Sequence, residues 1–350
     1  MTTNNQTPCV IFGASGYAGV ELAKLVQTHP ALSLQALFVS SASADAGKSL
    51  SALYPQLANL IDLELQAGNQ RNIADVFDAL SEQKSLVFLA TPHEFSHDIA
   101  PSLANENTTV LDLSGSFRLQ QPSLYPKHYS FEHKYSELLD SIPYALPEYQ
   151  SQSLQQHKLI SLPGCYPTAS QLAIKPLVDA ELLTEECVPV INAISGVSGA
   201  GRKASLATSF CELSLKPYNL FTHRHRPEIE QGVGRKVIFS PHVAAFERGI
   251  VATITLQVKT GTTEADIAEV FNRKYQTQPL VRIKSEIPAV KDVAYTPFCD
   301  IYWQLDGQDL IVVSAIDNVL KGASSQAIQC ANMVLGLPQE TGLVYTGASQ

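Results

Sequence analysis

The sequence lacks the features that mark membrane, exported and nucleic-acid-binding proteins. It has no apolar run of the roughly 18 residues that a membrane-spanning helix needs, and its first residues are polar, unlike a signal sequence. The 33 acidic residues outnumber the 24 basic residues, and the net charge of −9 argues against nucleic acid or an anionic membrane as a partner. We therefore expect a cytoplasmic protein.

Cysteine pairs at Cys-x-x-Cys spacing, internal repeats and low-complexity segments are also missing. The six cysteines are scattered at Cys9, Cys165, Cys187, Cys211, Cys299 and Cys330. In a chain of this kind we expect free thiols rather than a disulfide framework. Cys9, Cys187, Cys299 and Cys330 lie in apolar segments and are predicted to be small core residues. At 350 residues the chain is long enough for two domains, each with its own core.

A glycine-rich turn follows the first apolar segment, Val10–Phe12. A helix is predicted next, with Gly19, Leu22, Ala23 and Val26 on one face and an end at His29-Pro30. Strand, Gly-x-x-Gly-x-x-Gly and helix is the context of a dinucleotide-binding turn, although a plain tight turn is the simpler alternative. The residues predicted to bind the dinucleotide here are Gly13, Ser15, Gly16, Tyr17 and Gly19.

The next predicted strand, residues 32–39, bears on which dinucleotide binds. An NAD site would place an acidic residue near the end of this strand for the ribose 2′-hydroxyl. Hydroxyls and a lysine follow instead: Ser40, Ser41, Ser43 and Lys48. We therefore predict NADP(H).

Strand and helix signals then alternate, with strands at 86–90 and 110–113 and a helix between them that ends near Ala104. This alternation predicts a parallel, doubly wound sheet. His93 and His97 are expected to line the start of that helix. Arg118 follows the carboxyl end of the later strand, where it would bind a phosphate or carboxylate, or form a surface salt bridge.

Residues 120–156 show no clear periodicity and are expected to cross between domains. Cys165 comes after a strand end and the turn Pro163-Gly164, at the predicted start of a helix that Pro176 would interrupt or kink. A helix N-terminus favours thiolate. Lowering the pKa of a cysteine to about 6 needs about 3.4 kcal/mol, more than the dipole's roughly 0.3–2 kcal/mol, so a second cation is required. The alternative is an inert, buried cysteine.

A strand at 188–194 leads into a Gly/Ser-rich run, residues 195–203. We expect a flexible loop that offers backbone N–H groups to an anion or a ring, with an ordinary connection as the alternative. Ser195 and Arg202 are candidates for the substrate, and Ser198 and Gly199 for the cofactor.

His223 and His225 precede a helix start marked by Pro227. Neither histidine has a cysteine or carboxylate nearby at a familiar zinc spacing, so no metal is predicted. A histidine that pairs with Cys165 would supply the missing cation and a proton shuttle. We prefer His225 to His223, and Glu228 would orient whichever is used.

The remaining strand signals fall at 236–240, 250–258, 280–283, 299–305 and 310–316, with one helix carrying Ile267, Val270 and Phe271. They predict an open antiparallel or mixed sheet, whose exposed face, if apolar, would be an oligomer interface. Asn318, placed to meet the nicotinamide, precedes a helix expected to return to the first domain with one packed face: Ser324, Ala327, Ile328, Ala331, Val334 and Leu335. The predicted fold class is α/β, a Rossmann-type domain (1–155 with 318–350) plus an α+β catalytic and oligomerisation domain (156–317).

These motifs resemble the N-acetyl-gamma-glutamyl-phosphate reductases of arginine biosynthesis almost from end to end. The matching segments are Gly13–Gly19, Asp112–Ser114 with Phe117-Arg118, Pro163–Thr168, Ser195–Arg202, His223–Glu228, and Asp317-Asn318 with Lys321-Gly322. The resemblance implies the long-chain bacterial form, NADPH, a homodimer or homotetramer, and Cys165 as the nucleophile toward an acyl phosphate. It also extends to the wider fold group of aspartate-semialdehyde and glyceraldehyde-phosphate dehydrogenases.

Three other functions remain as alternatives. An aspartate-semialdehyde type of reductase would act on a different acyl phosphate. A cysteine hydrolase would need the cysteine and histidine but no dinucleotide, and the glycine turn speaks against it. A non-catalytic NADP-binding protein would leave Cys165 slow toward thiol reagents at neutral pH.

Overall fold

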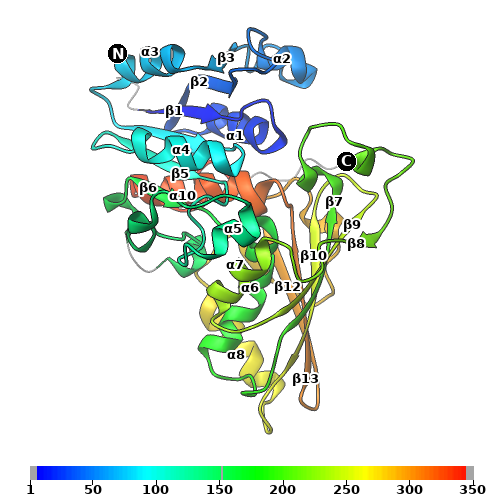
Figure 1. The fold of residues 1–350 in the computed structure, drawn as a ribbon. Coiled ribbons are helices and arrows are strands. Elements are labelled where there is room, and N and C mark those ends of the chain that lie inside the picture. The colour runs from blue at the N-terminus through cyan, green and yellow to red at the C-terminus, as the bar shows by residue number, and fades with distance from the viewer. Residues whose placement is uncertain (1–5, 151–152, 344–350) are drawn as a thin grey trace. The chain divides into compact units, whose positions relative to one another are not determined.

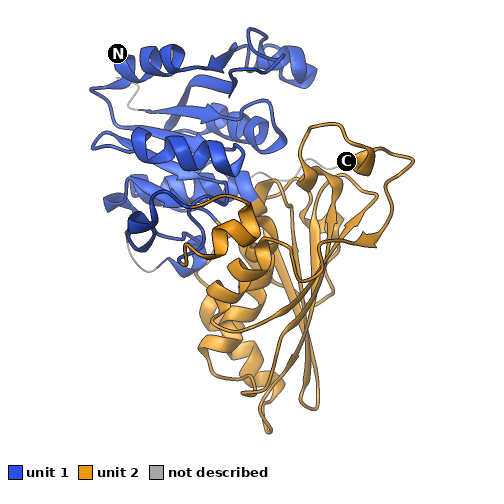
Figure 2. Cartoon of the chain, in the orientation of Figure 1, with its two compact units in different colours: residues 1–120, 133–162, 323–346 blue, residues 121–132, 163–322, 347–350 orange. Residues whose placement is uncertain are grey.

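The structure is a computed structural model that describes residues 6–150 and 153–343. Both ends of the predicted dinucleotide-binding domain, 1–5 and 344–350, lie outside the described residues, as do 151–152. The described residues within 1–120, 133–162 and 323–346 form one compact unit, unit 1, and those within 121–132 and 163–322 form unit 2 (Figure 2). The predicted domain boundaries at 155/156 and 317/318 stay a prediction.

Unit 1 is built on a six-stranded sheet in the order β3-β2-β1-β4-β5-β6, with every pair parallel (Figure 1). The strand order reverses between β1 and β4, as in a doubly wound sheet, so the predicted fold class is confirmed. The strands are β1 (Thr7–Phe12), β2 (Leu32–Ser40), β3 (Leu65–Gly68), β4 (Ser85–Leu89), β5 (Thr108–Asp112) and β6 (Leu159–Ser161). Its main helices are α1 (Tyr17–Thr28), α3 (Gln70–Leu80), α4 (His93–Leu103) and α10 (Ser325–Leu335).

The sequence pattern accounts for most of these elements. In α1, Gly19, Leu22, Ala23 and Val26 are buried as predicted, and the helix ends directly before His29. Each large apolar side chain buried in this way contributes roughly 1.5–3 kcal/mol. Strand β3 and helix α3 were not predicted, and α3 is amphipathic but buries only Leu80 fully.

Helix α10 differs from its prediction. It belongs to unit 1, where it contacts α1 and β5, but it is buried on nearly all sides rather than on one face. Gln326, Gln329 and Asn332 are fully buried. The Gln329 Nε2 donates to Glu148 Oε1 (3.0 Å), and the Asn332 Nδ2 donates to the Thr341 carbonyl (2.9 Å). These hydrogen bonds explain why polar residues, which the sequence pattern predicts to be exposed, are buried here.

Unit 2 has a seven-stranded mixed sheet in the order β11-β12-β13-β10-β7-β9-β8, which confirms the second part of the fold class. The pairs β7–β9 and β11–β12 are parallel and the others antiparallel. The strands are β7 (Val190–Gly196), β8 (Lys216–Pro217), β9 (Ile238–Ala244), β10 (Ile250–Gln257), β11 (Val281–Ile283), β12 (Cys299–Asp306) and β13 (Asp309–Ile316). The helices are α5 (Leu124–Tyr129), α6 (Cys165–Asp179), α7 (His225–Val233), α8 (Glu264–Tyr275) and the short α9 (Val290–Val293).

Helix α6 packs on β10 and β13 and also contacts α7 and α8, so helices cover one face of this sheet (Figure 1). Strand β10 alternates as predicted. Ile250, Ala252, Ile254 and Leu256 are buried, whereas the residues between them are partly or fully exposed on the other face. Strand β9 begins at Ile238, two residues later than predicted, and runs on to Ala244.

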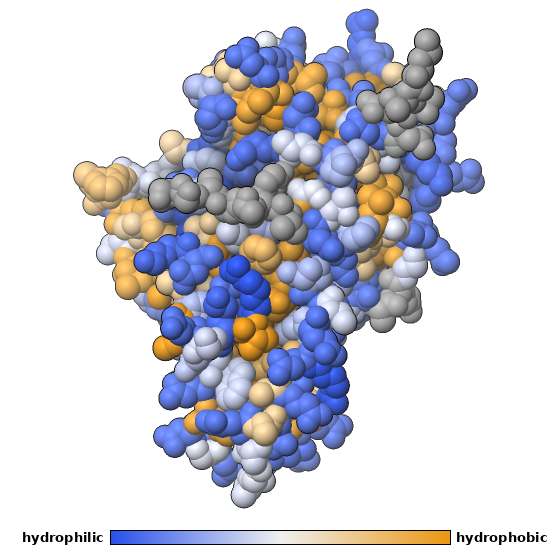
Figure 3. All heavy atoms as spheres, turned by 180° about the vertical axis from the view of Figure 1, so that it is seen from behind, coloured by the Kyte–Doolittle hydropathy of each residue, from blue (hydrophilic) through white to orange (hydrophobic). Residues whose placement is uncertain are grey.

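Hydrophobic side chains reach the surface in several places among hydrophilic ones, as the view in Figure 3 shows. Among the described residues, none of the helices is both long and apolar enough to span a membrane. Cys9, Cys187, Cys299 and Cys330 are buried, which confirms their predicted core positions, and Cys211 is exposed.

Candidate active site

Cys165 is the first residue of α6, directly after the N-cap Gly164, so its predicted place at a helix N-terminus is confirmed. The thiol is partly exposed, in contrast to the four core cysteines. Pro176 does not end the helix, contrary to one of the predicted outcomes. Helix α6 continues to Asp179 because Leu172, Ile174 and Leu177 are fully buried, which compensates for the backbone hydrogen bond that a proline removes.

Glu228 holds the turn before the cysteine. Its Oε1 accepts a hydrogen bond from the Gly164 N–H (2.8 Å), and its carbonyl accepts one from Gln171 Nε2 (3.1 Å). Glu228 is fully buried at the start of α7, so these bonds join the start of α7 to the start of α6. The sequence predicts that Glu228 orients a histidine, and the structure shows its carboxylate bonded to the cysteine turn.

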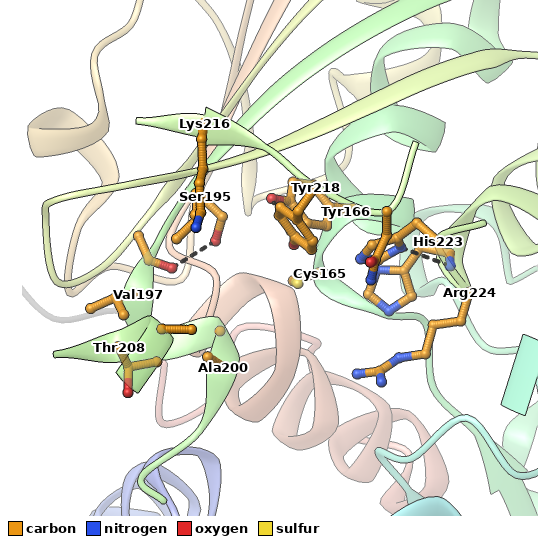
Figure 4. Close-up of a pocket in the computed structure, with 16 residues that line it drawn as sticks. Cys165, Tyr166, Ser195, Val197, Ala200, Thr208, Lys216, Tyr218, His223 and Arg224 are labelled. Carbon is orange, nitrogen blue, oxygen red and sulfur yellow. Dashed lines mark hydrogen bonds between the residues drawn. The ribbon is translucent and has the colours of Figure 1, made fainter. Parts of the chain in front are cut away.

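Cys165, His223 and His225 line the same cavity of about 460 Å³ in unit 2 (Figure 4). Both histidines are buried, with ring centroids 4.8 Å apart. His225 is the first residue of α7 rather than the residue before it. The pairing of one of these histidines with Cys165 stays a prediction, and the structure places both candidates in the cavity that Cys165 lines.

The two histidines differ in their electrostatic setting. Burial, with a contribution from the Arg224 cation, lowers the pKa of His223 to about 4. His223 is therefore neutral near pH 7, and its Nδ1 accepts the His225 N–H (3.1 Å), which places its proton on Nε2. A neutral imidazole cannot supply the cation that a thiolate needs, so His225 is the better candidate for that role.

Two tyrosines that the sequence analysis did not single out form a wall of the cavity. Tyr218 donates to the Tyr166 hydroxyl (3.3 Å), and Tyr166 donates to the His242 carbonyl (3.0 Å). The Tyr166 ring packs edge-on against both histidine rings, at 5.7 Å from His223 and 6.0 Å from His225. Burial raises the pKa of both tyrosines, so both stay protonated. They shape the cavity, a role that was not predicted for either, although Tyr166 lies in the motif Pro163–Thr168.

The Gly/Ser-rich run is more regular than predicted. Strand β7 includes Ser195 and Gly196, and a 3-10 helix, η5 (Val197–Ala200), follows directly, so the predicted flexible loop is wrong for residues 195–200. The run is held because Asn318 Nδ2 donates to Ser198 Oγ (3.0 Å) and Asn318 Oδ1 accepts from the Gly249 N–H (2.6 Å). Ser195 and Gly199 line the cavity. Contact of Asn318 with a nicotinamide stays a prediction, and both ends of its amide have protein partners.

Neither of the two arginines predicted to hold the substrate is among the residues that line the cavity, and their contact with the substrate stays a prediction. Arg118 is buried in unit 1, where its Nε donates to the Leu162 carbonyl (2.7 Å) and its Nη2 to the Leu113 carbonyl (2.6 Å). It is therefore not the exposed surface residue of the alternative prediction, and it fixes the strand end that precedes the cysteine turn. Arg202 is exposed, beyond η5, and is not among the residues that line the cavity.

Gly322 packs directly against the nucleophile. A Cβ at this position would lie 2.6 Å from the Cβ of Cys165. The turn that presents Gly322 is fixed by the buried Asp317 carboxylate, which accepts from the Val319 and Leu320 N–H groups (both 2.8 Å) and pairs with the Arg248 Nε (3.0 Å). The glycine therefore keeps the space into which the cysteine side chain fits.

We expect Gly322→Ala to lower kcat by about 10- to 100-fold because a displacement of about 1 Å at a reacting group has costs of this size. Steady-state kinetics and the rate of Cys165 alkylation measure the effect. Gly307→Ala is the control, since no atom lies within 4 Å of a Cβ there, although its φ of +60° adds some local strain. Wild-type rates in Gly322→Ala would contradict this role for the glycine.

The glycine-rich turn of unit 1 has the geometry that a bound dinucleotide needs. Gly13 has a φ of +78°, and a Cβ there would lie 2.1 Å from the Ala90 carbonyl oxygen. A Cβ on Gly19 would lie 2.2 Å from the Gly13 oxygen, so the helix packs closely on the turn. Helix α1 begins at Tyr17 with Gly16 as its N-cap, which directs free N–H groups toward an anion. These residues fit a pyrophosphate.

The predicted 2′-phosphate residues follow β2. Ser40 and Ser41 are exposed, and Ser43 is partly buried. The Lys48 Nζ lies 3.3 Å from the carboxylate of Asp45, a neighbour that was not predicted. A ribose phosphate would have to compete with Asp45 for Lys48, and the loss of an exposed ion pair of this kind costs only about 0–1 kcal/mol.

Comparison with known proteins first defines the class. A family model described as "Semialdehyde dehydrogenase, NAD binding domain" matches residues 9–157, and one described as "Semialdehyde dehydrogenase, dimerisation domain" matches residues 165–318. The fold is also that of solved aspartate semialdehyde dehydrogenases. The enzyme II of Vibrio cholerae superposes with a TM-score of 0.69 over 95% of this chain and 98% of that chain, at 17% identity. The Candida albicans enzyme with NADP gives 0.64 at 15% identity, over 94% of this chain and 98% of that chain.

The sequence comparison then gives the family. An N-acetyl-gamma-glutamyl-phosphate reductase of Yersinia pseudotuberculosis is 51% identical over 96% of this chain and 99% of its own length. The protein of the same name from Escherichia coli K12 is 49% identical, with the same coverage of both chains. The chain belongs to the N-acetyl-gamma-glutamyl-phosphate reductase family, whose members are oxidoreductases of the semialdehyde dehydrogenase class. The predicted resemblance is confirmed.

Proposed function

We propose that the protein reduces N-acetyl-L-glutamyl 5-phosphate to N-acetyl-L-glutamate 5-semialdehyde, with NADPH as the reductant and Cys165 as the nucleophile. The observation that carries the proposal is the placement of Cys165 at the start of α6 in one cavity with His223 and His225. Membership of the reductase family supports the substrate. A cysteine hydrolase and a non-catalytic NADP-binding protein lose support, because the family supplies both the dinucleotide domain and the redox chemistry.

In the first half-reaction the Cys165 thiolate attacks the acyl carbon of the substrate. The carbon–sulfur bond forms as the carbon–oxygen bond to phosphate breaks, which leaves a thioester and free phosphate. His225 accepts the thiol proton and, as an imidazolium, stabilises the thiolate. Backbone N–H groups at the start of α6 would stabilise the oxyanion, and each such donor contributes about 2.7–4 kcal/mol in enzymes where one has been removed.

When bound, the dinucleotide would supply the hydride that reduces the thioester carbon in the second half-reaction. His225 donates its proton to the resulting oxygen, and takes one back as the carbon–sulfur bond breaks to release the semialdehyde. Glu228 keeps the Gly164 turn in place throughout, because its buried carboxylate bonds the turn's backbone. Gly13, Ser15, Gly16, Tyr17 and Gly19 would hold the pyrophosphate. The cofactor's remaining predicted contacts are Ser40, Ser41, Ser43, Lys48, Ser198, Gly199 and Asn318.

We also propose that the protein is a homodimer or homotetramer that associates through the open face of the unit 2 sheet. The family model over unit 2 is described as a dimerisation domain. On the face opposite the helices, Ile311 of β13 is 44% exposed beside Thr255 of β10, and Ile238 of β9 is 39% exposed. The mass from light scattering, measured for the protein and for Ile311→Glu, tests this association.

The activity test is direct. Purified protein should oxidise NADPH with N-acetylglutamyl phosphate and release one phosphate per turnover. The serine and lysine side chains after β2 favour NADPH, so the KM for NADH should be at least about 10-fold higher, as expected for one lost charge-assisted contact of about 1.5–3 kcal/mol. Turnover with aspartyl phosphate but not with the N-acetylated substrate would transfer the proposal to the aspartate-semialdehyde type. Equal KM values for NADPH and NADH would contradict the cofactor choice alone.

A further inference from the structure

The cavity around Cys165 is positively charged although the chain as a whole is acidic. Lys216 and Arg224 line it together with the two histidines, and none of its lining residues is an aspartate or glutamate. The net charge of the chain is −9, so a cavity that collects cations and excludes carboxylates is a local feature that the composition does not predict. Such a cavity favours anionic ligands.

Neither cation is neutralised within the described residues. The side chains of Lys216 and Arg224 form no ion pair and no hydrogen bond there, and both are exposed. By contrast, Lys48, Lys134, Lys175 and Arg226 each pair with a carboxylate. Lys216 begins β8, where it pairs in register with Val243 of β9, and Arg224 is the N-cap of α7. Regular elements of unit 2 therefore present both charges to the cavity.

The two cations lie on either side of the nucleophile. Figure 4 shows Lys216 near Ser195 on one side of the Cys165 sulfur, and Arg224 beyond His223 on the other. The proposed substrate carries its negative charges in a matching arrangement when its acyl carbon reaches the sulfur. The phosphate lies on one side of the reacting carbon, and the chain that ends in a carboxylate lies on the other.

We propose that Lys216 and Arg224 bind the two anionic groups of the substrate, its phosphate and its carboxylate, and so select acyl phosphates that carry a second anionic group. This proposal rests on the proposed reductase function and deepens it. It assigns to these residues the part that the sequence predicted for Arg118 and Arg202. Arg118 already donates to two carbonyls, and Arg202 does not line the cavity.

The test uses two thiol reagents of nearly equal size that differ in charge. Iodoacetate and iodoacetamide both alkylate the Cys165 sulfur with loss of iodide, and only iodoacetate is anionic. The ratio of their alkylation rates, followed by mass spectrometry on the peptide that contains Cys165, measures how strongly the cavity attracts an anion. Peptide analysis separates Cys165 from the exposed Cys211. The variants are Lys216→Gln, Arg224→Gln and the double variant. The control is Lys203→Gln, which removes the same charge from an exposed residue outside the cavity.

We expect each single variant to lower the iodoacetate-to-iodoacetamide ratio about two- to five-fold, the effect of one partly screened charge pair. The double variant should lower it about 10-fold, because two separate sites act nearly additively. Inorganic phosphate should slow labelling of the unaltered protein more than that of either variant. In turnover, both single variants should raise the KM for the acyl phosphate with a smaller change in kcat.

A ratio in both variants equal to that of Lys203→Gln would overturn the proposal. The labelling ratio does not depend on turnover, so it also separates this proposal from the proposed function. If the unaltered protein fails to oxidise NADPH with the acyl phosphate, the reductase proposal fails, and the charge selectivity of the cavity is still measured. If the reductase activity is present but the ratio does not change, only the assignment of Lys216 and Arg224 fails.

Discussion

Cys165→Ser should lower kcat at least about 1000-fold, because removal of a covalent nucleophile costs factors of this size or larger. A serine hydroxyl at the start of α6 stays un-ionised, since the helix dipole supplies no more than about 2 kcal/mol. The substituted protein can still fold, because only one partly exposed atom changes. Steady-state oxidation of NADPH with the acyl phosphate measures the effect.

Two controls make this result specific. Binding of NADPH, followed by its fluorescence, should be unchanged, because the glycine-rich turn belongs to unit 1. Incubation of the unaltered protein with the acyl phosphate and no dinucleotide should add the N-acetylglutamyl mass to the peptide that contains Cys165, and the serine variant should show no such addition. Reductase activity retained by Cys165→Ser would remove the covalent mechanism.

The second large effect is expected at His225. Loss of a general acid–base group costs about 100- to 10,000-fold, so His225→Ala should fall in this range. His223→Ala should lose less, about 10-fold. Its imidazole is neutral near pH 7 because burial lowers its pKa to about 4, so its removal takes away a hydrogen bond to the His225 backbone but no charge.

The pH dependence of Cys165 alkylation distinguishes the two histidines. If His225 supplies the cation, His225→Ala should shift the rise of the alkylation rate toward the ordinary cysteine pKa of about 8.5, whereas His223→Ala should leave it nearly in place. The reverse result, with normal kinetics in His225→Ala and a collapse in His223→Ala, would assign both roles to His223.

The sequence predicted the fold well where local periodicity and tertiary burial agree. Strand β10 alternates because one face packs on helix α6, and α1 shows a buried stripe because it lies on a sheet. Helix α10 shows the limit. Its glutamines and asparagine look like an exposed face, but they are buried with hydrogen-bond partners from residues 148, 339 and 341. Periodicity does not reveal such partners, because they come from distant segments.

In the candidate site, too, residues with local sequence signals were predicted, and residues placed by distant segments were not. Cys165 was predicted because it follows a turn at a proline-marked helix start, and His225 because it precedes the helix start marked by Pro227, which are local signals. Lys216 and Tyr218 line the cavity without any local mark, since their place depends on how β8 and β9 meet, and Arg224, between the two histidines, was not predicted as a site residue. Arg118 donates to two backbone carbonyls, a use of an arginine that its position in the sequence does not indicate, and its predicted contact with a ligand stays a prediction.

The path of the chain between the two units also bears on how the protein is made. Unit 1 gains its last helix, α10, only after the chain has run through residues 163–322 of unit 2. On the ribosome, the N-terminal parallel sheet therefore emerges long before the helix that packs on α1 and β5. Until α10 has left the ribosome, the part of this unit's apolar surface that it covers has no partner, and transient exposure of such surface makes a nascent chain prone to aggregate.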